Sequence, residues 1–592
     1  MTKPAFLGVE RSIGGKRWRP RLTDDRTALA ISQRLGLPDV LGRVLAARGV
    51  EADEAEAFLD PRLRDLLPDP SHLRDMDTAV TRIVEAITSG EKIGVFADYD
   101  VDGASSAALL VRFFAAIGRD VSVYVPDRIA EGYGPNAPAL MKLKDSGVSL
   151  VITVDCGTTA FAPLEAAADA GLDVVVIDHH VAEPQLPVAV AVVNPNRLDE
   201  DSPVGQMCAA GVTFLLVVAI NRALRDAYWY GEGHGEPSLM QWLDIVALAT
   251  VADVVPLTGV NRALVRQGLS VMAQRQNPGL AALAVVARLD ERPEAWHLGF
   301  MLGPRVNAGG RVGEAGLGVR LLTATDRDEA TGLAMRLDNY NAERREIETA
   351  VLDAAMAQAE IQAKDEPPLI LVAGEGWHPG VIGIVAGRLK ETFGRPACVV
   401  ALDGEIGKGS GRSVPGVGLG PAVIAAHQAG LLINGGGHQM AAGFTVEAER
   451  LTAFKEFLTG HVSDQHGGRF PVPEIGIDGA VRPEGATIEL IELLDGAGPY
   501  GSGNPRPRFV VPAVTPINAG IVGTNHVRCL LAAPEGGTRL KAIFFRSAGT
   551  PAGETILNAR GGVLHVAGHL NIDTWQGNRR PQFVIEDVAR AG

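Results

Sequence analysis

Short apolar runs alternate with longer amphipathic stretches between residues 92 and 193. Near-continuous Val/Ile runs separated by helical patterns are typical of a parallel sheet that is covered by helices on both faces. The predicted strands are 93–97, 121–125, 150–154, 174–177 and 189–193. A helical block containing residues 244–253 follows, so residues 71–324 are expected to form one α/β domain.

The segments on either side of this domain have different patterns. Residues 1–70 are Leu/Ala-rich and helical in pattern, and they end in a proline-punctuated stretch. Thr325, with Asp328 three residues later, is typical of a helix N-cap, and the helical pattern continues to Lys364. Residues 325–366 are therefore predicted to form one long helix that connects two domains.

Two further domains are expected after this helix. An apolar run at 369–373 begins a second, smaller α/β domain at 367–465. Residues 466–592 are β-patterned with Gly-rich turns, and residues 564–572 alternate with period two, as a strand of a small barrel does. The predicted fold class is multidomain α/β with a C-terminal OB-like β-barrel.

Length and composition agree with this picture. A chain of 592 residues is too long for one core, and 46% hydrophobic with 21% charged residues argues against a mainly disordered chain. The four cysteines form no CxxC pair, which disfavours a zinc ribbon or a disulfide framework. The longest apolar stretch, 209–220, is too short to cross a bilayer and no leader opens the chain, so we expect a cytoplasmic monomer without membrane contact.

The net charge of −15 argues against indiscriminate polyanion binding, but it leaves a focused nucleic-acid site open. Basic residues are concentrated locally, for example in the cluster Lys16, Arg17, Arg19 and Arg21.

Acidic and imidazole side chains follow several apolar runs at the point where each run ends. They are Asp98, Asp100 and Asp102 after 93–97, Asp155 after 150–154, Asp178-His179-His180 after 174–177, and Asp253 after 249–252. Each piece alone has an ordinary explanation as a turn, a helix cap or a packed histidine. Together they favour a divalent-metal site, because the C-terminal ends of parallel strands share one edge and ligands bind there.

Glycine-rich segments mark a second region of interest. Residues 407–413 and 435–443 are predicted to be loops, and 380–387 is predicted to begin a helix; exposed N–H groups with Ser410, Arg412 or His438 could hold phosphates. The alternative is that these glycines only serve tight turns.

In the predicted barrel, two stretches at 498–509 and 573–583 mix aromatic residues with arginines. Phe509 and Phe583 are expected in the core, whereas Trp575 and Arg579 are the better candidates for binding a single strand at the surface.

The strand-end motifs resemble those of the DHH phosphoesterase superfamily, namely the segments 98–103, 154–157 and 178–180. Arg128 with Glu131-Gly-Tyr-Gly134, the segment Gly303-Pro-Arg-Val-Asn-Ala308 and the proline-rich segment 58–70 narrow the resemblance to the RecJ exonuclease family, over nearly the whole chain.

This resemblance implies roles for particular residues. Two Mn²⁺ or Mg²⁺ ions would be held by Asp98, Asp100, Asp155, His179 and Asp253. His180 would contact the scissile phosphate or orient the site, and Asp102 would support the ligands. Ser410, Arg412 and Arg128 would capture a 5′ phosphate, and Tyr133 would stack on a terminal base. Arg305 would pair with a backbone phosphate, with Asn307 nearby, unless Arg305 only ties two loops together.

The function implied is a metal-dependent 5′-to-3′ exonuclease that is specific for single-stranded DNA, releases nucleoside 5′-monophosphates and serves DNA repair and recombination. Its partner would be single-stranded DNA with a 5′ phosphate, and a single-strand-binding protein or a helicase are candidate protein partners. The alternatives are a phosphodiesterase for short oligoribonucleotides or cyclic dinucleotides, and an inactive scaffold that only binds single strands.

Overall fold

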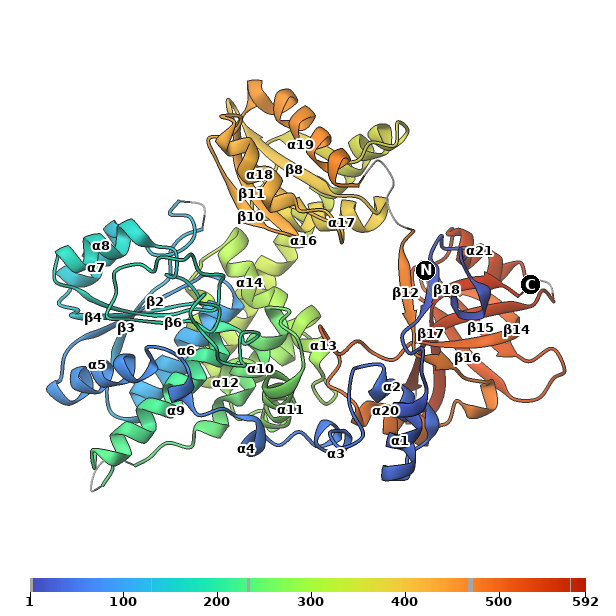
Figure 1. Cartoon of the computed structure of the whole chain (residues 1–592), viewed down its shortest axis with the longest axis horizontal. Helices are drawn as coiled ribbons and strands as arrows, with labels where there is room; N and C mark the ends of the chain where they lie inside the picture. The colour runs from blue at the N-terminus through green and yellow to red at the C-terminus, as the bar shows by residue number, and fades with distance from the viewer. Residues whose placement is uncertain are drawn as a thin grey trace. The chain divides into compact units, whose positions relative to one another are not determined.

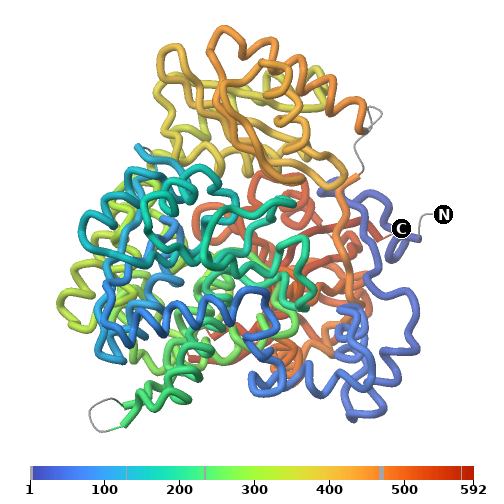
Figure 2. The backbone as a smooth tube through the Cα atoms, turned by 60° about the vertical axis from the view of Figure 1, so that its left-hand side comes forward, coloured from blue at the N-terminus to red at the C-terminus, as the bar shows by residue number. Residues whose placement is uncertain are grey.

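The computed structural model describes residues 4–128, 130–231, 235–466, 472–559, 561–574 and 577–591. The chain divides into two compact units (Figures 1 and 2). Unit 1 comprises Met1–Leu67, Pro256–Arg266 and Pro471–Gly592, and unit 2 comprises Pro68–Val255 and Gln267–Phe470. Among the described residues, no helix is both long enough and apolar enough to span a membrane.

The first sheet of unit 2 has five parallel strands in the order β3-β2-β4-β5-β6. Its strands are β2 (Ile93–Ala97), β3 (Val121–Tyr124), β4 (Leu150–Val154), β5 (Asp173–Ile177) and β6 (Ala191–Val193). Every residue of β2 and β4 is buried, because helices cover both faces of the sheet. The predicted parallel-sheet domain is thus confirmed.

Two groups of helices cover this sheet (Figure 1). The helices α7 (Ala137–Asp145) and α8 (Phe161–Asp169) pack with the apolar side chains of one face. On the other face lie α5 (Met76–Ser89), α6 (Val101–Ala116) and α9 (Ala209–Asp226). Further helices of this part of the unit are α10 (Leu243–Ala252), α12 (Pro278–Val286), α13 (Ala295–His297), α14 (Gly303–Val312) and α15 (Leu317–Thr323).

The long helix is confirmed as α16 (Arg327–Ala363). Its N-cap is Asp326 and not Thr325, because the Asp326 carboxylate accepts the Glu329 N–H at 2.8 Å. The negative charge of this carboxylate also interacts favourably with the positive end of the helix dipole. The first half packs against α12 and α14, and the second half contributes Val351, Ala355 and Ala359 to the core of the second sheet. One helix therefore serves both cores of unit 2.

The second sheet has the order β10-β11-β9-β8-β7, with only β7 and β8 parallel. Its elements are β7 (Ile370–Glu375), α17 (Ile382–Phe393), β8 (Ala397–Asp403), β9 (Ile406–Arg412), α18 (Leu419–Gln428), β10 (Asn434–His438), β11 (Ala441–Glu447) and α19 (Leu451–His466).

The prediction that the segments 407–413 and 435–443 are loops is wrong, because both lie mainly in strands. A Cβ on Gly409 would overlap the Phe444 ring, and one on Gly407 would lie 2.7 Å from Val400. Glycine therefore fills the inward positions of β9 for lack of space, while the alternate positions carry Lys408, Ser410 and Arg412.

Unit 1 is built around a closed five-stranded barrel, which confirms the OB-like prediction. Its strands follow the order β14-β15-β16-β18-β17, and β17 pairs back onto β14. They are β14 (Phe509–Val522), β15 (His526–Ala532), β16 (Arg539–Phe544), β17 (Leu564–Asp573) and β18 (Arg580–Arg590), with α20 (Ile488–Gly496) and α21 (Pro551–Leu557) beside them.

The N-terminal segment belongs to the same unit as the barrel. It holds α1 (Arg26–Leu35), α2 (Asp39–Ala46), α3 (Ala55–Leu59), α4 (Leu63–Leu66) and one strand that the helical pattern did not indicate, β1 (Arg17–Pro20). β1 pairs with β12 (Glu474–Ile477), and the buried Trp18 indole donates to Asp587 at 2.8 Å. The first and last described segments of the chain consequently belong to one unit.

The basic cluster at residues 16–21 is largely neutralised within unit 1. Arg17 pairs with Glu10 and Glu474, and Arg21 lies 3.4 Å from the buried Asp478 carboxylate. These arginines hold the segment in place and do not form an isolated basic patch.

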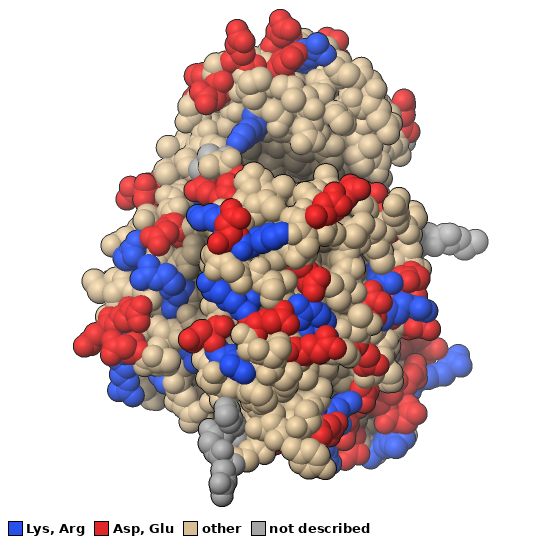
Figure 3. All heavy atoms as spheres, turned by 90° about the vertical axis from the view of Figure 1, so that its left-hand side faces the viewer, with Lys and Arg blue, Asp and Glu red and all other residues tan. Residues whose placement is uncertain are grey.

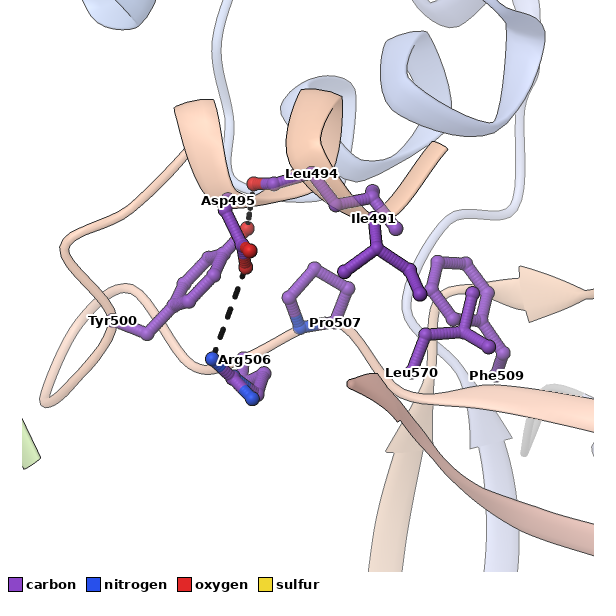
Figure 4. Close-up of a pocket in the computed structure, with 8 residues that line it drawn as sticks. All are labelled: Ile491, Leu494, Asp495, Tyr500, Arg506, Pro507, Phe509 and Leu570. Carbon is purple, nitrogen blue, oxygen red and sulfur yellow. Dashed lines mark hydrogen bonds and ion pairs between the residues drawn. The ribbon is translucent and has the colours of Figure 1, made fainter. Parts of the chain in front are cut away.

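Phe509 and Phe583 are fully buried in the barrel core, as expected. A slot between α20 and the barrel is lined by Leu494, Tyr500 and Phe509, with Asp495 and Arg506 paired at its rim (Figure 4). Its volume of about 10 Å³ leaves room for roughly one water molecule, so it is no nucleotide site.

Candidate metal centre and arginine pocket

Parallel topology brings the strand-end side chains together. β2, β4 and β5 are neighbours, so Asp98, Asp155 and Asp178 leave the same edge of the sheet. Asp100 caps the N-terminus of α6, and Asp253 is the C-cap of α10. We call Asp98, Asp100, Asp102, Asp155, His179 and Asp253 the acidic cluster.

Potential ligand atoms in this cluster lie within 4.8 Å of one another in three groups. The groups are Asp98-Asp100-Asp155, Asp155-His179-His180 and Asp102-His179-Asp253. His179 Nε2 is central, at 3.3 Å from Asp155 Oδ1 and 3.8 Å from Asp253 Oδ2.

The electrostatics of the cluster fit a divalent cation. Asp98 Oδ1 and Asp155 Oδ1 are buried and have no hydrogen-bond donor. Burial raises the pKa of Asp98, as does the Asp100 charge, and burial with the charges of Asp102 and Asp100 raises the pKa of Asp253 to about 8. Unpaired buried carboxylate oxygens are costly unless a cation neutralises them, and oxygen with imidazole donors suits Mn²⁺, or Mg²⁺ on the oxygens.

Asp102 differs from the other carboxylates because both of its oxygens are already used. They accept the N–H groups of Ala209 and Ala210 at the start of α9, at 2.7 and 2.8 Å. Asp102 thus ties α9 to α6 within the cluster, and we expect it to support the other ligands.

Asp178 fixes the position of His180. Its carboxylate accepts the N–H groups of Thr158, His179 and His180 and lies 2.7 Å from His180 Nδ1. Burial lowers the pKa of His180, but the Asp178 hydrogen bond and charge, followed by the Asp253 and Asp98 charges, outweigh it and raise the pKa to about 9. The contact with Asp178 therefore favours the protonated form of the His180 imidazole.

Sequence reasoning missed two asparagines that support the histidines. Asn194 donates to the His180 carbonyl at 2.8 Å, and Asn196 Nδ2 donates to the His179 carbonyl at 2.5 Å. The signal was present as Asn-Pro-Asn directly after the strand β6.

The backbone is strained at one member of the cluster, Asp155, and directly after another, Asp253. Asp155 has φ 60° and Val254, directly after Asp253, has φ 62°. A β-branched residue rarely adopts this left-handed conformation, and such strain concentrates at functional sites.

A pocket of about 690 Å³ lies in unit 2 between the domains of its two sheets. We call it the arginine pocket. It is lined by Arg128, Tyr133, Arg311, residues 379–384 in part, Lys408, Gly409, Ser410, Arg412 and glycine-rich parts of β10 and β11. Its volume is in the range of small-ligand sites.

The arginine pocket is suited to an anion. Burial and the Arg128 charge lower the pKa of Arg412, and burial with the charges of Arg128 and Arg344 lowers the pKa of Arg311 to about 10. The described residues that line the pocket include no carboxylate. A bound phosphate would relieve the repulsion between these cationic side chains and accept hydrogen bonds from them. Arg311 was not predicted, although it follows the Gly-Pro-Arg-Val-Asn-Ala segment by three residues.

Tyr133 joins the pocket to the cluster. It lines the pocket, and its hydroxyl donates to the Asp155 carbonyl at 3.0 Å and lies 3.2 Å from His180 Nδ1. The residue is still 51% exposed, so an aromatic surface remains for a ligand.

Other predicted residues lie elsewhere. Arg305 of α14 pairs with Asp338 of α16 at 2.8 Å and donates to the Met301 carbonyl, so it joins two helices and not the two loops of the alternative. Asn307 accepts the Val101 N–H. His438 is exposed at the end of β10, outside the pocket lining. Arg579 pairs with Glu492, and Trp575 lies outside the described residues.

Figure 3 shows acidic and basic side chains intermixed on one face of the molecule.

Comparisons with known proteins agree with the sequence motifs. Family models match as the DHH family N-terminal domain over residues 92–250, the DHHA1 domain over 365–464 and the RecJ OB domain over 477–587. The chain is 35% identical over 565 residues to the single-stranded-DNA-specific exonuclease RecJ of Escherichia coli, covering 93% of this chain and 96% of the relative. It is 32% identical over 578 residues to that of Bacillus subtilis, covering 97% and 71%.

Among solved structures, RecJ in complex with Mn²⁺ from Thermus thermophilus matches with a TM-score of 0.79 at 30% identity, covering 96% of this chain and 78% of that one. RecJ in complex with Mg²⁺ from the same organism matches with a TM-score of 0.73 at 28% identity, covering 96% and 77%. The strand-end cluster, the fold and these similarities lead to one conclusion: the chain belongs to the RecJ family of single-stranded-DNA-specific exonucleases.

Proposed function

We propose that the protein is a metal-dependent exonuclease that degrades single-stranded DNA from its 5′ end and releases nucleoside 5′-monophosphates, in DNA repair and recombination. The observation that carries the proposal is the position of Tyr133, which lines the arginine pocket and bonds to Asp155 and His180 of the neighbouring centre. A terminal phosphate in the pocket would leave the next phosphodiester beside the cluster.

Two Mn²⁺ or Mg²⁺ ions would be held by Asp98, Asp100, Asp155, His179 and Asp253. The orphaned oxygens of Asp98 and Asp155 and the central His179 imidazole are the donors that support this set. Bound ions would supply Lewis acidity at the phosphate and a more acidic water.

The protein's own side chains would bind and orient the strand. Arg128, Arg311, Arg412 and Ser410 would hold the 5′ phosphate, and Tyr133 would stack on the terminal base. His180, protonated through Asp178, would donate a hydrogen bond to the phosphate under attack.

Arg305 would contact a backbone phosphate with the part of its guanidinium that Asp338 and Met301 leave open, with Asn307 beside it. The barrel would bind more of the strand through the outward residues of β15 and β16, where Arg528 and Arg539 are exposed, and through Trp575 and Arg579. Proteins that coat or unwind single strands are the proposed partners.

The domains we propose are an N-terminal segment at 1–70, a catalytic domain at 71–324, the connecting helix at 325–366, a phosphate-binding domain at 367–465 and the strand-binding barrel at 466–592. His438, at the edge of the phosphate-binding domain, would contact the substrate outside the pocket.

The test uses purified protein, Mn²⁺ and a long single-stranded DNA with a 5′ phosphate. Label at the 5′ end should appear at once in mononucleotides, while label at the 3′ end should persist in shortening strands. Asp155→Ala should abolish cleavage and keep strand binding. Release of the 3′ label first, or cleavage of dinucleotides with long strands intact, would contradict the proposal.

A further inference from the structure

One exposed pair of aromatic residues lies outside both sites described above. Phe300 is 75% exposed and Trp296 is 46% exposed. They lie four residues apart in a continuous helical run that comprises α13, a π-helical turn at Leu298–Leu302 and α14. Residues four apart lie on one side of a helix, so the two rings form one surface. We call it the aromatic pair.

The aromatic pair is held in a defined orientation. The Trp296 ring lies 3.8 Å, centre to centre, from the ring of His297, which is buried. His297 Nδ1 accepts the Glu294 N–H, and Nε2 lies 2.9 Å from Glu291. On the other side, Leu298 and Leu302 are fully buried around the exposed Phe300. The π-turn thus turns an aromatic residue outward between two core anchors, and such turns are frequent at functional sites.

The helical run that carries the pair extends along the whole candidate site. At its C-terminal end Arg311 lines the arginine pocket. In the middle, Asn307 accepts the N–H of Val101, the neighbour of Asp100. Four residues before Asn307, a Cβ on Gly303 would lie 3.2 Å from Ala252, the neighbour of Asp253. The run therefore leads from the pocket, past the acidic cluster, to the aromatic pair.

The spacing suits a single strand. Arg311 follows Phe300 by eleven positions, which corresponds to about 16 Å along a helix axis. A strand of a few nucleotides spans that distance. Exposed aromatic rings bind single-stranded nucleic acid because every base can stack on them.

We infer that Phe300 and Trp296 form a base-stacking platform for the nucleotides on the 3′ side of the cleaved bond. This inference rests on the proposed function, which puts the 5′ phosphate in the arginine pocket. The platform gives the enzyme a preference for strands of more than about three nucleotides, because a shorter substrate anchored at Arg311 does not reach Phe300.

The experiment compares Phe300→Ala, Trp296→Ala and Phe300→Trp with the wild type on 5′-phosphorylated oligothymidylates of 2, 4, 8 and 20 nucleotides. The alanine variants should raise KM for the 20-mer about tenfold and leave KM for the dinucleotide unchanged. Phe300→Trp should keep the wild-type KM for both substrates. Tyr228→Ala, which removes an aromatic residue that is 91% exposed elsewhere in unit 2, is the matched control.

A second measurement separates base stacking from other roles. Equilibrium binding of a labelled 20-mer without divalent metal should be weakened by Phe300→Ala, but binding of a strand with abasic sites at nucleotides 3 to 6 should not. An equal loss of affinity for both strands would overturn the platform. So would unchanged affinity for both strands together with altered self-association of the variant. Failure of the wild type to release 5′ nucleotides would refute the proposed function, whereas the binding comparison would still judge the aromatic pair.

Discussion

Removing one carboxylate from the acidic cluster should stabilise the metal-free protein and abolish the stabilisation that bound metal provides. In Asp155→Asn the side chain keeps its shape, but it loses a buried charge whose Oδ1 atom accepts no hydrogen bond. Two ionised carboxylates 4.8 Å apart, the limit within the group Asp98-Asp100-Asp155, repel by about 3 kcal/mol at an effective dielectric constant of about 20. Burial and the charges of Asp102, Asp100 and Asp98 raise the pKa of Asp155, so the native state is destabilised as pH rises.

At pH 8 without metal, Asp155→Asn should therefore be more stable than the wild type by about 3 kcal/mol. With Mn²⁺ at about 100 times its Kd, the wild type should gain about 2.7 kcal/mol, and the variant should gain almost nothing. The assay is urea denaturation, monitored through hydrogen exchange of peptides from α10. The control is Asp353→Asn, which changes an exposed residue of α16. Lower metal-free stability, or full protection by Mn²⁺ in the variant, would refute the assignment of Asp155 to the metal centre.

Three further predictions concern charge and packing. Asp178→Asn removes the main partner of His180, the carboxylate that raises the pKa of the imidazole, so the basic limb of the kcat–pH profile should move to lower pH; an unmoved limb would show that His180 does not set it. Gly409→Ala should destabilise the protein by about 1–3 kcal/mol in urea, because its Cβ overlaps Phe444, whereas Gly443→Ala, with open space, should not. Burial raises the pKa of Asp244 to about 7, so Asp244→Asn should stabilise the protein by about 4 kcal/mol at pH 8 and much less at pH 5; equal urea midpoints at pH 8 would contradict this.

The sign of the Asp244 effect follows from its folded pKa lying above the unfolded value of 3.8. The unfolded state releases its proton first as pH rises, so the native state loses stability between about pH 4 and 7. The amide of the variant still accepts the Ile245 N–H but carries no charge to bury.

The elements that could be predicted from sequence are those fixed by local pattern. Val/Ile runs of four or five residues specify buried parallel strands, and parallel strands must end at one edge. For this reason the sequence alone assigns Asp98, Asp155 and His179 to one site. The long helix was equally clear, and only its cap was displaced by one residue, from Thr325 to Asp326.

Contacts between residues far apart in the sequence follow only from the tertiary structure. The glycines of β9 look like loop residues until the Phe444 ring is found opposite Gly409. The strand β1 is visible only through its pairing with β12, more than four hundred residues later. Arg311 enters the arginine pocket because α14 packs along α16, the helix that also serves the second sheet. The unpartnered oxygens of Asp98 and Asp155 are evident only once every neighbour is in place. Sequence pattern determines which face of an element is buried, whereas the partner of that face is set by the packing of the whole chain.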